Sequence, residues 1–502
     1  MEDDPSDRPR PNGILAPAGG DALLTDLYQI TMSAAYFNAG IQDRRAVFHQ
    51  FFRTAPLGLR GAIVAGLEPA IDWLETARIG DADVDYLASL NHVTGKPMFA
   101  PEFLDAIRGR RFDVDIDAVT PGSVVCGHAP ILRIEGPIWQ CQWIETALLC
   151  IINFQTLIAT AAANLCDAAD GDPVLEFGLR RAQGVDGGIA ASRAAVIGGC
   201  VATSDVAAGR RFDLPIRGTH AHSWVMSFDD EIESFRRYAD AMPDNCVFLV
   251  DTYDTLRGVD RAIQIGHELD RRGHQMVGVR LDSGDLCALS KSARQKLNDA
   301  GMPDAVIVAS NDLDADKIRD LKRRGAAIDV WGVGTQLVTS ASQPALGGVY
   351  KLAAIADGDG NGNGNGNGNG NDEIRYRPRI KRSEDAIKSS YPGRLQVRRF
   401  TGGERTVDLM YDVDLDSGAI DGAFSTDGDA VSTPATFADL VPGMPRLHPV
   451  VRDGRRVNDP VPLDVIRSTA AEQRSLLIDD HYQLAIDGGL WRRRQTMLEA
   501  TQ

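Results

Sequence analysis

Short apolar runs alternate with amphipathic stretches through the middle of the chain. The clearest runs end in polar residues and occupy 245–254, 276–285, 304–312 and 328–335. Each of the first three is followed by a stretch with helical spacing, and strands that alternate with helices are typical of a parallel sheet covered on both faces. The pattern extends upstream to 172–184 and 213–224, and less clearly to 199–205. Six or seven such units predict a closed or nearly closed α/β barrel.

The regions on either side of these units have other patterns. Residues 21 to about 145 mix short helices with β-like segments, and another strand is expected just after 347. The glycine-asparagine tract at 357–372 has no apolar residue, so we expect a flexible surface loop. We expect residues 1–20 to form a disordered tail and residues 451–502 to form a helical segment.

Charge and cysteine content narrow the class of protein. The chain has 502 residues and a formal net charge of −17, which disfavours nucleic acid and anionic membranes as partners. Its seven cysteines form no CxxC pair, so we expect reduced core thiols. We find no apolar stretch long enough to span a bilayer and no secretory signal. The expected location is therefore the cytoplasm.

The ends of the predicted strands carry the candidate chemistry, because barrel enzymes place their active sites there. Adjacent arginines, Arg180 and Arg181, end the run at 172–184. Since neighbouring strand residues face opposite ways, we expect one of the two to point into the site, where guanidinium suits phosphate or carboxylate. The alternative is a surface pair that bridges neighbouring acidic residues.

The segment VRLDSGD (279–285) places Arg280, Asp282 and Asp285 around a tight Ser-Gly turn. Carboxylates at this spacing can hold Mg²⁺ together with substrate phosphates. Alternatively, Ser283 or Asp285 caps the following helix and the arginine is ion-paired. The local sequence does not decide between these readings.

Two later strand ends are rich in small polar residues and glycines. If their strands are neighbours, they could form an anion cradle of backbone amides and hydroxyl groups. The residues concerned are Ser310, Asn311, Gly332, Gly334 and Thr335.

The segment RGTHAHSW (217–224) contains His220 and His222, two of only nine histidines in the chain. On a strand both rings would lie on one side, as zinc sites require, but no third His or Cys follows at a regular interval. The other interpretations are core histidines and a histidine that carries a transferred group covalently. The residues alone do not distinguish the two rings.

Taken together and in order, these segments resemble the nicotinate phosphoribosyltransferase family over roughly residues 20 to 450. The matching blocks are LLTDLYQITMSAAY (23–36), EFGLRRAQGVDGG (176–188), RGTHAHSWVMSF (217–228), GVRLDSGDL (278–286), ASNDLD (309–314), WGVGTQLVTS (331–340), PALGGVYKL (344–352) and KSSYPGR (388–394). The last block has Arg394 where the family often has lysine.

The resemblance implies a fold and an activity. The fold would be an irregular α/β barrel at 146–346 with an open-faced α/β sandwich domain formed by 21–145 and about 347–450. The enzyme would be a homodimer with active sites at its interface. It would join nicotinate to phosphoribosyl pyrophosphate, giving nicotinate mononucleotide for NAD salvage. The reaction would require Mg²⁺ and, as in ligases, would be coupled to ATP hydrolysis through a phosphohistidine.

The resemblance also assigns roles. His222 fills the histidine position of the family's Gly-Thr-x-Ala-His pattern and would be the phosphoryl acceptor, whereas His220 falls on the variable position. Tyr28, Thr219 and Arg280 match contacts to nicotinate, with the tyrosine supplied by the partner subunit. Thr335 matches a contact to phosphoribosyl pyrophosphate. Arg180 or Arg181 would contact the substrate phosphate or ring, and Asp282 would contact Mg²⁺ or the ribose.

Two alternatives stay open from the sequence. The chain could use nicotinamide or quinolinate in place of nicotinate. It could also be a non-catalytic relative on the same scaffold, although the intact blocks around His222 and Asp282 argue against that.

Overall fold

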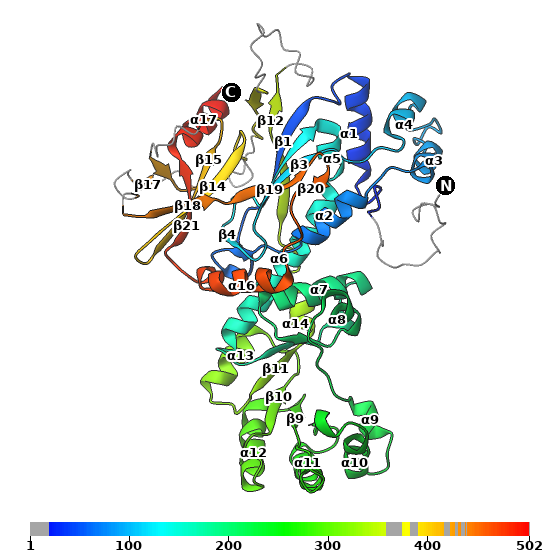
Figure 1. Ribbon diagram of the computed structural model, residues 1–502, viewed down its shortest axis with the longest axis vertical. Coiled ribbons are helices and arrows are strands. Elements are labelled where there is room, and N and C mark those ends of the chain that lie inside the picture. Colours follow the sequence, from blue (N-terminus) through cyan, green and yellow to red (C-terminus); the bar gives the residue numbers. More distant parts are fainter. Residues whose placement is uncertain are drawn as a thin grey trace.

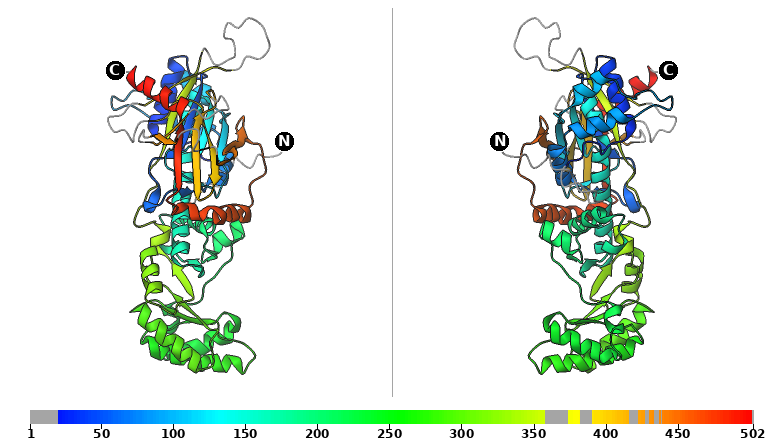
Figure 2. Two further views of the ribbon diagram at one scale, coloured as in Figure 1. Left: turned by 90° about the vertical axis from the view of Figure 1, so that its left-hand side faces the viewer. Right: turned by 90° about the vertical axis from the view of Figure 1, so that its right-hand side faces the viewer.

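The computed structural model describes residues 20–357, 374–381, 390–415, 422–426, 430–432, 437 and 439–500. The predicted tail, apart from Gly20, and the predicted glycine-asparagine loop, apart from Asp357, lie outside these residues. The molecule is elongated, with a parallel sheet towards one end and two further sheets at the other (Figures 1 and 2).

A six-stranded parallel sheet forms one end of the molecule, in the strand order β7-β6-β11-β10-β9-β8. The strands are β6 (Val174–Glu176), β7 (Ala202–Thr203), β8 (Val247–Leu249), β9 (Gly278–Leu281), β10 (Val306–Ala309) and β11 (Val330–Val333). Helices that follow the strands are α7 (Val185–Gly198), α8 (Val206–Phe212), α9 (His222–Met226), α10 (Glu231–Ala241), α11 (Thr255–Asp270), α12 (Leu286–Asp299), α13 (Ala315–Arg323) and α14 (Thr335–Val338). The α/β class and the four clearest predicted strands are confirmed.

This sheet is not closed into a barrel by backbone pairing, since no strand pair joins β7 to β8 in the part of the chain that the structure describes. The segment at 214–221, predicted as a strand, bridges the gap instead. It pairs with β7 only through the isolated bridge between Thr203 and Ile216. On its other side, the Leu249 amide of β8 donates to Nε2 of His220. The prediction of a strand at 213–224 is therefore wrong. The His220 side chain accepts the β8 amide that a seventh strand would otherwise pair with through its backbone.

An antiparallel sheet of seven strands forms the core of the opposite end, in the order β13-β12-β1-β5-β3-β19-β20. Its strands are β1 (Arg45–Phe52), β3 (Asp115–Val119), β5 (Leu132–Pro137), β12 (Gly348–Ala356), β13 (Tyr376–Pro378), β19 (Leu447–Arg452) and β20 (Arg455–Arg456), with β2 (Ala62–Ile63) and β4 (Val124–Val125) pairing separately. The helices around it are α1 (Leu27–Asn38), α2 (Leu67–Thr76), α3 (Asp81–Ser89), α4 (Pro101–Ile107) and α5 (Ile138–Trp143).

A third, mixed sheet uses residues from the last quarter of the chain and runs β17-β16-β21-β15-β14-β18. Its strands are β14 (Leu395–Gly402), β15 (Arg405–Asp412), β16 (Ala423–Phe424), β17 (Ala430–Ser432), β18 (Val441–Pro445) and β21 (Tyr482–Asp487). Helices α16 (Leu463–Gln473) and α17 (Gly488–Glu499) flank β21. The segment at 451–502 is therefore not purely helical, because β21 pairs in parallel with β15 inside this sheet.

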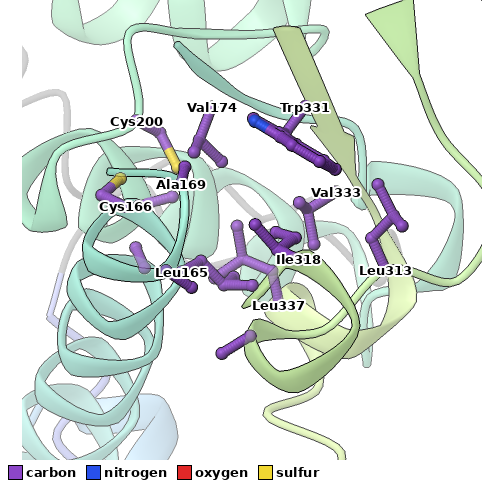
Figure 3. Close-up of a cluster of buried hydrophobic side chains, with 14 of the residues drawn as sticks. Leu165, Cys166, Ala169, Val174, Cys200, Leu313, Ile318, Trp331, Val333 and Leu337 are labelled. Carbon is purple, nitrogen blue, oxygen red and sulfur yellow. The ribbon is translucent and has the colours of Figure 1, made fainter. Parts of the chain in front are cut away.

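Helix α6 (Glu145–Ala168) lies between the two ends of the molecule (Figure 1). It is long and apolar enough to cross a membrane, so the expectation that no such stretch exists is wrong, but 67% of its most apolar window is buried in the protein. Figure 3 shows Leu165 and Cys166 of α6 in one cluster with Val333 and Leu337. Burial of these side chains accounts for the composition of the helix.

Candidate active site

The carboxyl ends of β8, β9 and β10 place three polar segments next to one another. Arg280 of β9 lies in register between Leu249 of β8 and Val308 of β10. Asp251, Asp282 and Ser310 follow these three strands and so reach the same edge of the sheet. Parallel strands deliver their ends to one edge, which is why residues far apart in the sequence meet here.

Arg280, Asp282 and Ser310 form a closed triangle of polar contacts. The Ser310 hydroxyl donates to Oδ1 of Asp282 at 2.5 Å, and Nε of Arg280 donates to the Ser310 hydroxyl oxygen at 3.0 Å. A guanidinium nitrogen of Arg280 lies 3.5 Å from Oδ2 of Asp282. Each side chain is thus held by the other two, which fixes the direction of the arginine.

His222 belongs to the same cluster, but it is the first residue of helix α9 and not part of a strand. Its Nδ1 lies 3.1 Å from the Thr252 hydroxyl oxygen, and its Nε2 lies 3.8 Å from Oδ2 of Asp282. The side chain is 41% exposed. Thr252, the third residue after β8, was not among the predicted site residues, although it lies in the polar end of the apolar run at 245–254.

His220 has a different environment, so the predicted shared face of the two histidines is wrong. It is buried among Phe235, Tyr238 and Phe248, and its Nε2 accepts the Leu249 amide at 3.3 Å. Burial, with a smaller contribution from the positive charge of Arg280, lowers the pKa of His220 to about 4. The ring is therefore neutral near pH 7 and holds the connecting segment against β8.

Thr219 and Asp251 flank these histidines. Thr219 is half-buried in the segment between Ile216 and α9. Oδ2 of Asp251 accepts the Asp282 amide at 3.1 Å and the Ser283 hydroxyl, whereas its Oδ1 is buried and has no hydrogen-bond partner. An unpaired buried carboxylate oxygen is costly, so this atom is available to a ligand at the site.

Asp285 does not share a contact with Asp282. Its Oδ1 accepts the Cys287 and Ala288 amides and so caps α12, and it pairs with Arg324 at 3.4 Å. The structure therefore favours the capping alternative for Asp285. No group of three or more metal-ligating side chains occurs among the described residues.

Arg180 and Arg181 lie in the short 3-10 helix Leu179–Arg181 after β6, and both are exposed. The expectation that they alternate across a strand is wrong, because the strand ends at Glu176. That buried carboxylate accepts the Ser192 and Thr203 hydroxyls and the Gly178 amide, which turns the backbone out of the sheet. Neither guanidinium has an ion-pair partner among the residues that the structure describes.

The residues of the predicted anion cradle lie at the ends of two neighbouring strands, β10 and β11. Asn311 has φ of 105° and is exposed, while Ser310 before it is buried. Gly334 precedes α14 and Thr335 is its first residue. Asn311 also lines an open depression of about 580 Å³ with Asp285, Lys317 and Arg324.

The ring of Phe177 packs so closely against Gly332 that it leaves no room for a side chain there. A Cβ atom at this glycine would lie 2.8 Å from that ring, and the Arg280 guanidinium carbon lies 5.9 Å from the ring centre. The close approach of β11 thus keeps an aromatic face beside the arginine. Phe177 is a second site residue that was not predicted from the sequence.

Tyr28 lies near the start of α1, at the opposite end of the molecule from α9 (Figure 1). It is 52% exposed, and partial burial and the negative charges of Glu145 and Asp26 raise its pKa. Glu145 also interacts with Lys351, whose pKa is lowered by burial and by the nearby Lys381 and Arg53. Tyr28 therefore lies beside Glu145, which in turn lies near Lys351, and one chain does not bring it to His222.

Comparisons with known proteins decide the family. Residues 23–153 match the nicotinate phosphoribosyltransferase N-terminal domain, and residues 174–359 match the nicotinate phosphoribosyltransferase family. The chain belongs to this family. Nicotinate phosphoribosyltransferase of Bacillus subtilis is 45% identical over 75% of this chain and 73% of its own length. The human nicotinate phosphoribosyltransferase is 33% identical over 78% of each chain.

Solved structures agree with this assignment. The structure of human nicotinic acid phosphoribosyltransferase covers 95% of this chain and 100% of its own, with a TM-score of 0.77 and 28% identity. Nicotinate-nucleotide pyrophosphorylase of Pyrococcus furiosus covers 93% and 99%, with a TM-score of 0.68 and 20% identity. The second likeness concerns the fold alone.

Proposed function

We propose that this member of the nicotinate phosphoribosyltransferase family joins nicotinate to phosphoribosyl pyrophosphate, for NAD salvage in the cytoplasm. The products are nicotinate mononucleotide and pyrophosphate. The observation that carries the proposal is the cluster of His222, Arg280, Asp282 and Ser310 at the carboxyl edge of the parallel sheet. It combines an anion-binding side chain, a fixed carboxylate and a nucleophilic ring.

Arg280 is the group that suits the carboxylate of nicotinate. Its guanidinium is already oriented by Ser310 and Asp282, so little further ordering is needed to bind a planar anion. The ring of Phe177 beside it offers an aromatic face to the pyridine. In the reaction the pyridine nitrogen attacks C1 of the ribose while pyrophosphate leaves. Holding both reactants in line lowers the entropic part of the activation free energy.

Mg²⁺ fits the donor set at this edge, although the pair of ligands differs from the one predicted. Asp282 faces the site, and Asp251 supplies a buried oxygen without a partner. These two carboxylates would hold the ion in place of Asp282 with Asp285, whose Oδ1 is occupied by the cap. When bound, the ion would neutralise charge on substrate phosphates.

His222 is proposed to couple the synthesis to ATP hydrolysis as a phosphohistidine. Its exposed ring lies beside the proposed Mg²⁺ ligands, as phosphoryl transfer from ATP requires. Thr219, Arg180, Arg181, Asn311, Gly332, Gly334 and Thr335 are proposed to contact the substrates.

We further propose a homodimer in which Tyr28 and Lys351 of one protomer complete the site of its partner. Two observations support this arrangement. The elements that carry Tyr28 and Lys351, α1 and β12, lie far from α9 along the long axis of the molecule, and the charge of Lys351 is partly buried. A partly desolvated lysine attracts phosphate strongly when a partner brings it to the ligand.

The test is an assay with nicotinate, phosphoribosyl pyrophosphate, ATP and Mg²⁺, using the folded full-length chain. We expect nicotinate mononucleotide and ADP. Nicotinamide and quinolinate serve as competing bases, and a preference for either one would exclude the role given to Arg280. Formation of no mononucleotide from any base would overturn the proposed function.

A further inference from the structure

Strand β6 ends in Glu176, whose buried carboxylate accepts hydrogen bonds from three donors. Its Oε2 accepts the Ser192 hydroxyl at 2.9 Å and the Thr203 hydroxyl at 2.5 Å, and its Oε1 accepts the Gly178 amide. In the part of the chain that the structure describes, no Lys or Arg forms an ion pair with it. A carboxylate buried among neutral donors costs more free energy than an amide of the same shape would, which points to a role beyond packing.

The three donors come from three different segments. Gly178 opens the turn that carries both arginines after β6, Ser192 lies in α7, and Thr203 ends β7. Strand β7 is also held by backbone pairing, in which Thr203 lies opposite Glu176. Gly178 lies beyond the end of that pairing, so the turn after β6 is the segment that depends most on the carboxylate.

The turn after β6 packs closely against the start of α14. A Cβ atom on Gly178 would lie 2.6 Å from Cβ of Val338, and one on Gly334 would lie 3.2 Å from the Phe177 carbonyl oxygen. Gly334 directly precedes Thr335, a proposed contact to phosphoribosyl pyrophosphate. The close fit places the turn beside this contact and leaves little tolerance in its position.

Arg180 and Arg181 follow Gly178 within three residues, and both are exposed. Since neither guanidinium forms an ion pair within the described ranges, the backbone of the turn is what sets their place. A displacement of about 1 Å in a group that binds a substrate can be costly for the reaction. The direction of the backbone at Gly178 therefore decides whether a guanidinium reaches a ligand beside α14.

We propose that Glu176 is a positioning residue that fixes the turn after β6, so that an arginine of the pair Arg180 and Arg181 meets the phosphates of phosphoribosyl pyrophosphate. This inference rests on the proposed function. Glu176 acts through the Gly178 amide and not by contact with a substrate. Because a charge-assisted hydrogen bond is about twice as strong as a neutral one, an uncharged acceptor at this position holds the turn less firmly.

The experiment compares wild type, Glu176→Gln and Asp172→Asn by steady-state kinetics with nicotinate, phosphoribosyl pyrophosphate, ATP and Mg²⁺. Glutamine keeps the shape of the side chain but offers one acceptor oxygen to three donors. We expect the KM for phosphoribosyl pyrophosphate to rise about five- to tenfold and kcat to stay within about twofold, because binding is weakened and the reacting groups are unchanged.

Asp172→Asn is the matched control, because its carboxylate lies at the other end of the same strand. Oδ2 of Asp172 accepts Nζ of Lys322 at 2.8 Å and Nε1 of Trp331 at 3.1 Å. The variant should lower the thermal unfolding temperature and leave the KM for phosphoribosyl pyrophosphate unchanged. If Glu176→Gln fails to fold, Ser192→Ala removes one of the three donors from α7 without altering the turn, and the KM should rise about two- to threefold.

A chain without the two arginines separates positioning from a general loss of stability. In Arg180→Gln/Arg181→Gln the KM for phosphoribosyl pyrophosphate should already be raised, and adding Glu176→Gln should change it by less than about twofold. Independent effects would multiply instead.

Three results would overturn the inference while wild type still forms nicotinate mononucleotide. These are an unchanged KM in folded Glu176→Gln, an equal rise in Asp172→Asn, and a wild-type KM or a multiplied effect in the arginine-free chain. Formation of no mononucleotide by wild type would overturn the proposed function, and the inference with it.

Discussion

The preference for nicotinate over other bases depends on Arg280, through its guanidinium group. It is held by Ser310 and Asp282 before any ligand arrives, and it lies over the Phe177 ring. A carboxylate on the pyridine gains a charge-assisted contact that an amide cannot provide.

Replacement of Arg280 by glutamine should therefore remove the preference for nicotinate. We expect the KM for nicotinate to rise roughly ten- to hundredfold, since a hydrogen bond to a charged group contributes about 1.5–3 kcal/mol. Steady-state kinetics with nicotinate and nicotinamide measure the ratio. Arg257→Gln, at an exposed position on α11, is the control. If Arg280→Gln kept the wild-type preference for nicotinate over nicotinamide, another group would be responsible for recognising the base.

The two histidines of the GTHAHSW segment should respond differently to alanine. His222→Ala should abolish acid-labile phosphate incorporation from ATP and separate ATP hydrolysis from synthesis. His220→Ala should keep the phosphate label but destabilise the protein by about 2–4 kcal/mol, because it leaves a cavity and an unpaired Leu249 amide. Labelling with ATP and urea unfolding measure the two effects. Loss of the label in folded His220→Ala alone would reverse the assignment.

At the scale of elements, the contact between β11 and the segment after β6 shapes the aromatic face. Gly332→Ala would place its Cβ 2.8 Å from the Phe177 ring, so the ring must move. We expect a cost of about 1–3 kcal/mol in unfolding free energy and a clear rise in the KM for nicotinate. Gly187→Ala on α7, where a Cβ has open space, should be neutral. Wild-type kinetics in Gly332→Ala would mean that the ring does not contact the base.

How much the sequence predicted depends on the kind of element. The strands around Val247–Leu249, Gly278–Leu281, Val306–Ala309 and Val330–Val333 were predicted because strands buried on both faces are continuously apolar. The third sheet was not predicted, because β21 joins it in parallel from the C-terminal segment that was expected to be helical.

The site residues divide in the same way. Strand ends such as Asp282 and Ser310 were found because the topology brings them to one edge. The different environments of His220 and His222 were not predicted. The prediction assumed that side chains alternate across a strand, whereas a helix begins at His222. The cap formed by Asp285 was foreseen as an alternative, and only the three-dimensional contacts decide it.

At the scale of the whole molecule, two buried histidines tie stability to pH. His49 of β1 accepts the Leu395 amide of β14 and so joins two sheets, and burial together with Arg133 and Arg394 lowers its pKa to about 3. His220 has a pKa of about 4. Both rings are neutral in the folded state, whereas in the unfolded chain they bind protons below about pH 6.5.

Stability from these rings is therefore complete above about pH 6.5 and falls as the pH is lowered towards 4. The unfolding free energy should fall by up to about 1.4 kcal/mol per pH unit for each histidine in this window. His49→Gln should reduce this pH dependence in urea unfolding, even if it lowers stability near pH 7. His92→Gln, at an exposed turn, is the control. An equal slope for wild type and His49→Gln would contradict the assignment.

The long shape of the chain gives the last prediction, because Tyr28 and His222 lie at opposite ends of one protomer (Figure 1). If the active site combines Tyr28 of one protomer with His222 of its partner, Tyr28→Ala and His222→Ala chains should each be nearly inactive. Co-expressed with different tags, they should form mixed dimers in which one site has both residues and the other has neither. Random pairing should restore about a quarter of wild-type activity.

The mixed sample must be compared with the same two proteins purified separately and combined just before the assay, before subunits exchange. Activity in doubly tagged dimers and none in the fresh mixture would place the site between protomers. Failure of the doubly tagged dimers to gain activity, with both parents folded and dimeric, would mean that Tyr28 acts within its own chain or not at all. In that case the partly buried Lys351 would need another role, since burial lowers its pKa even though Glu145 lies near it.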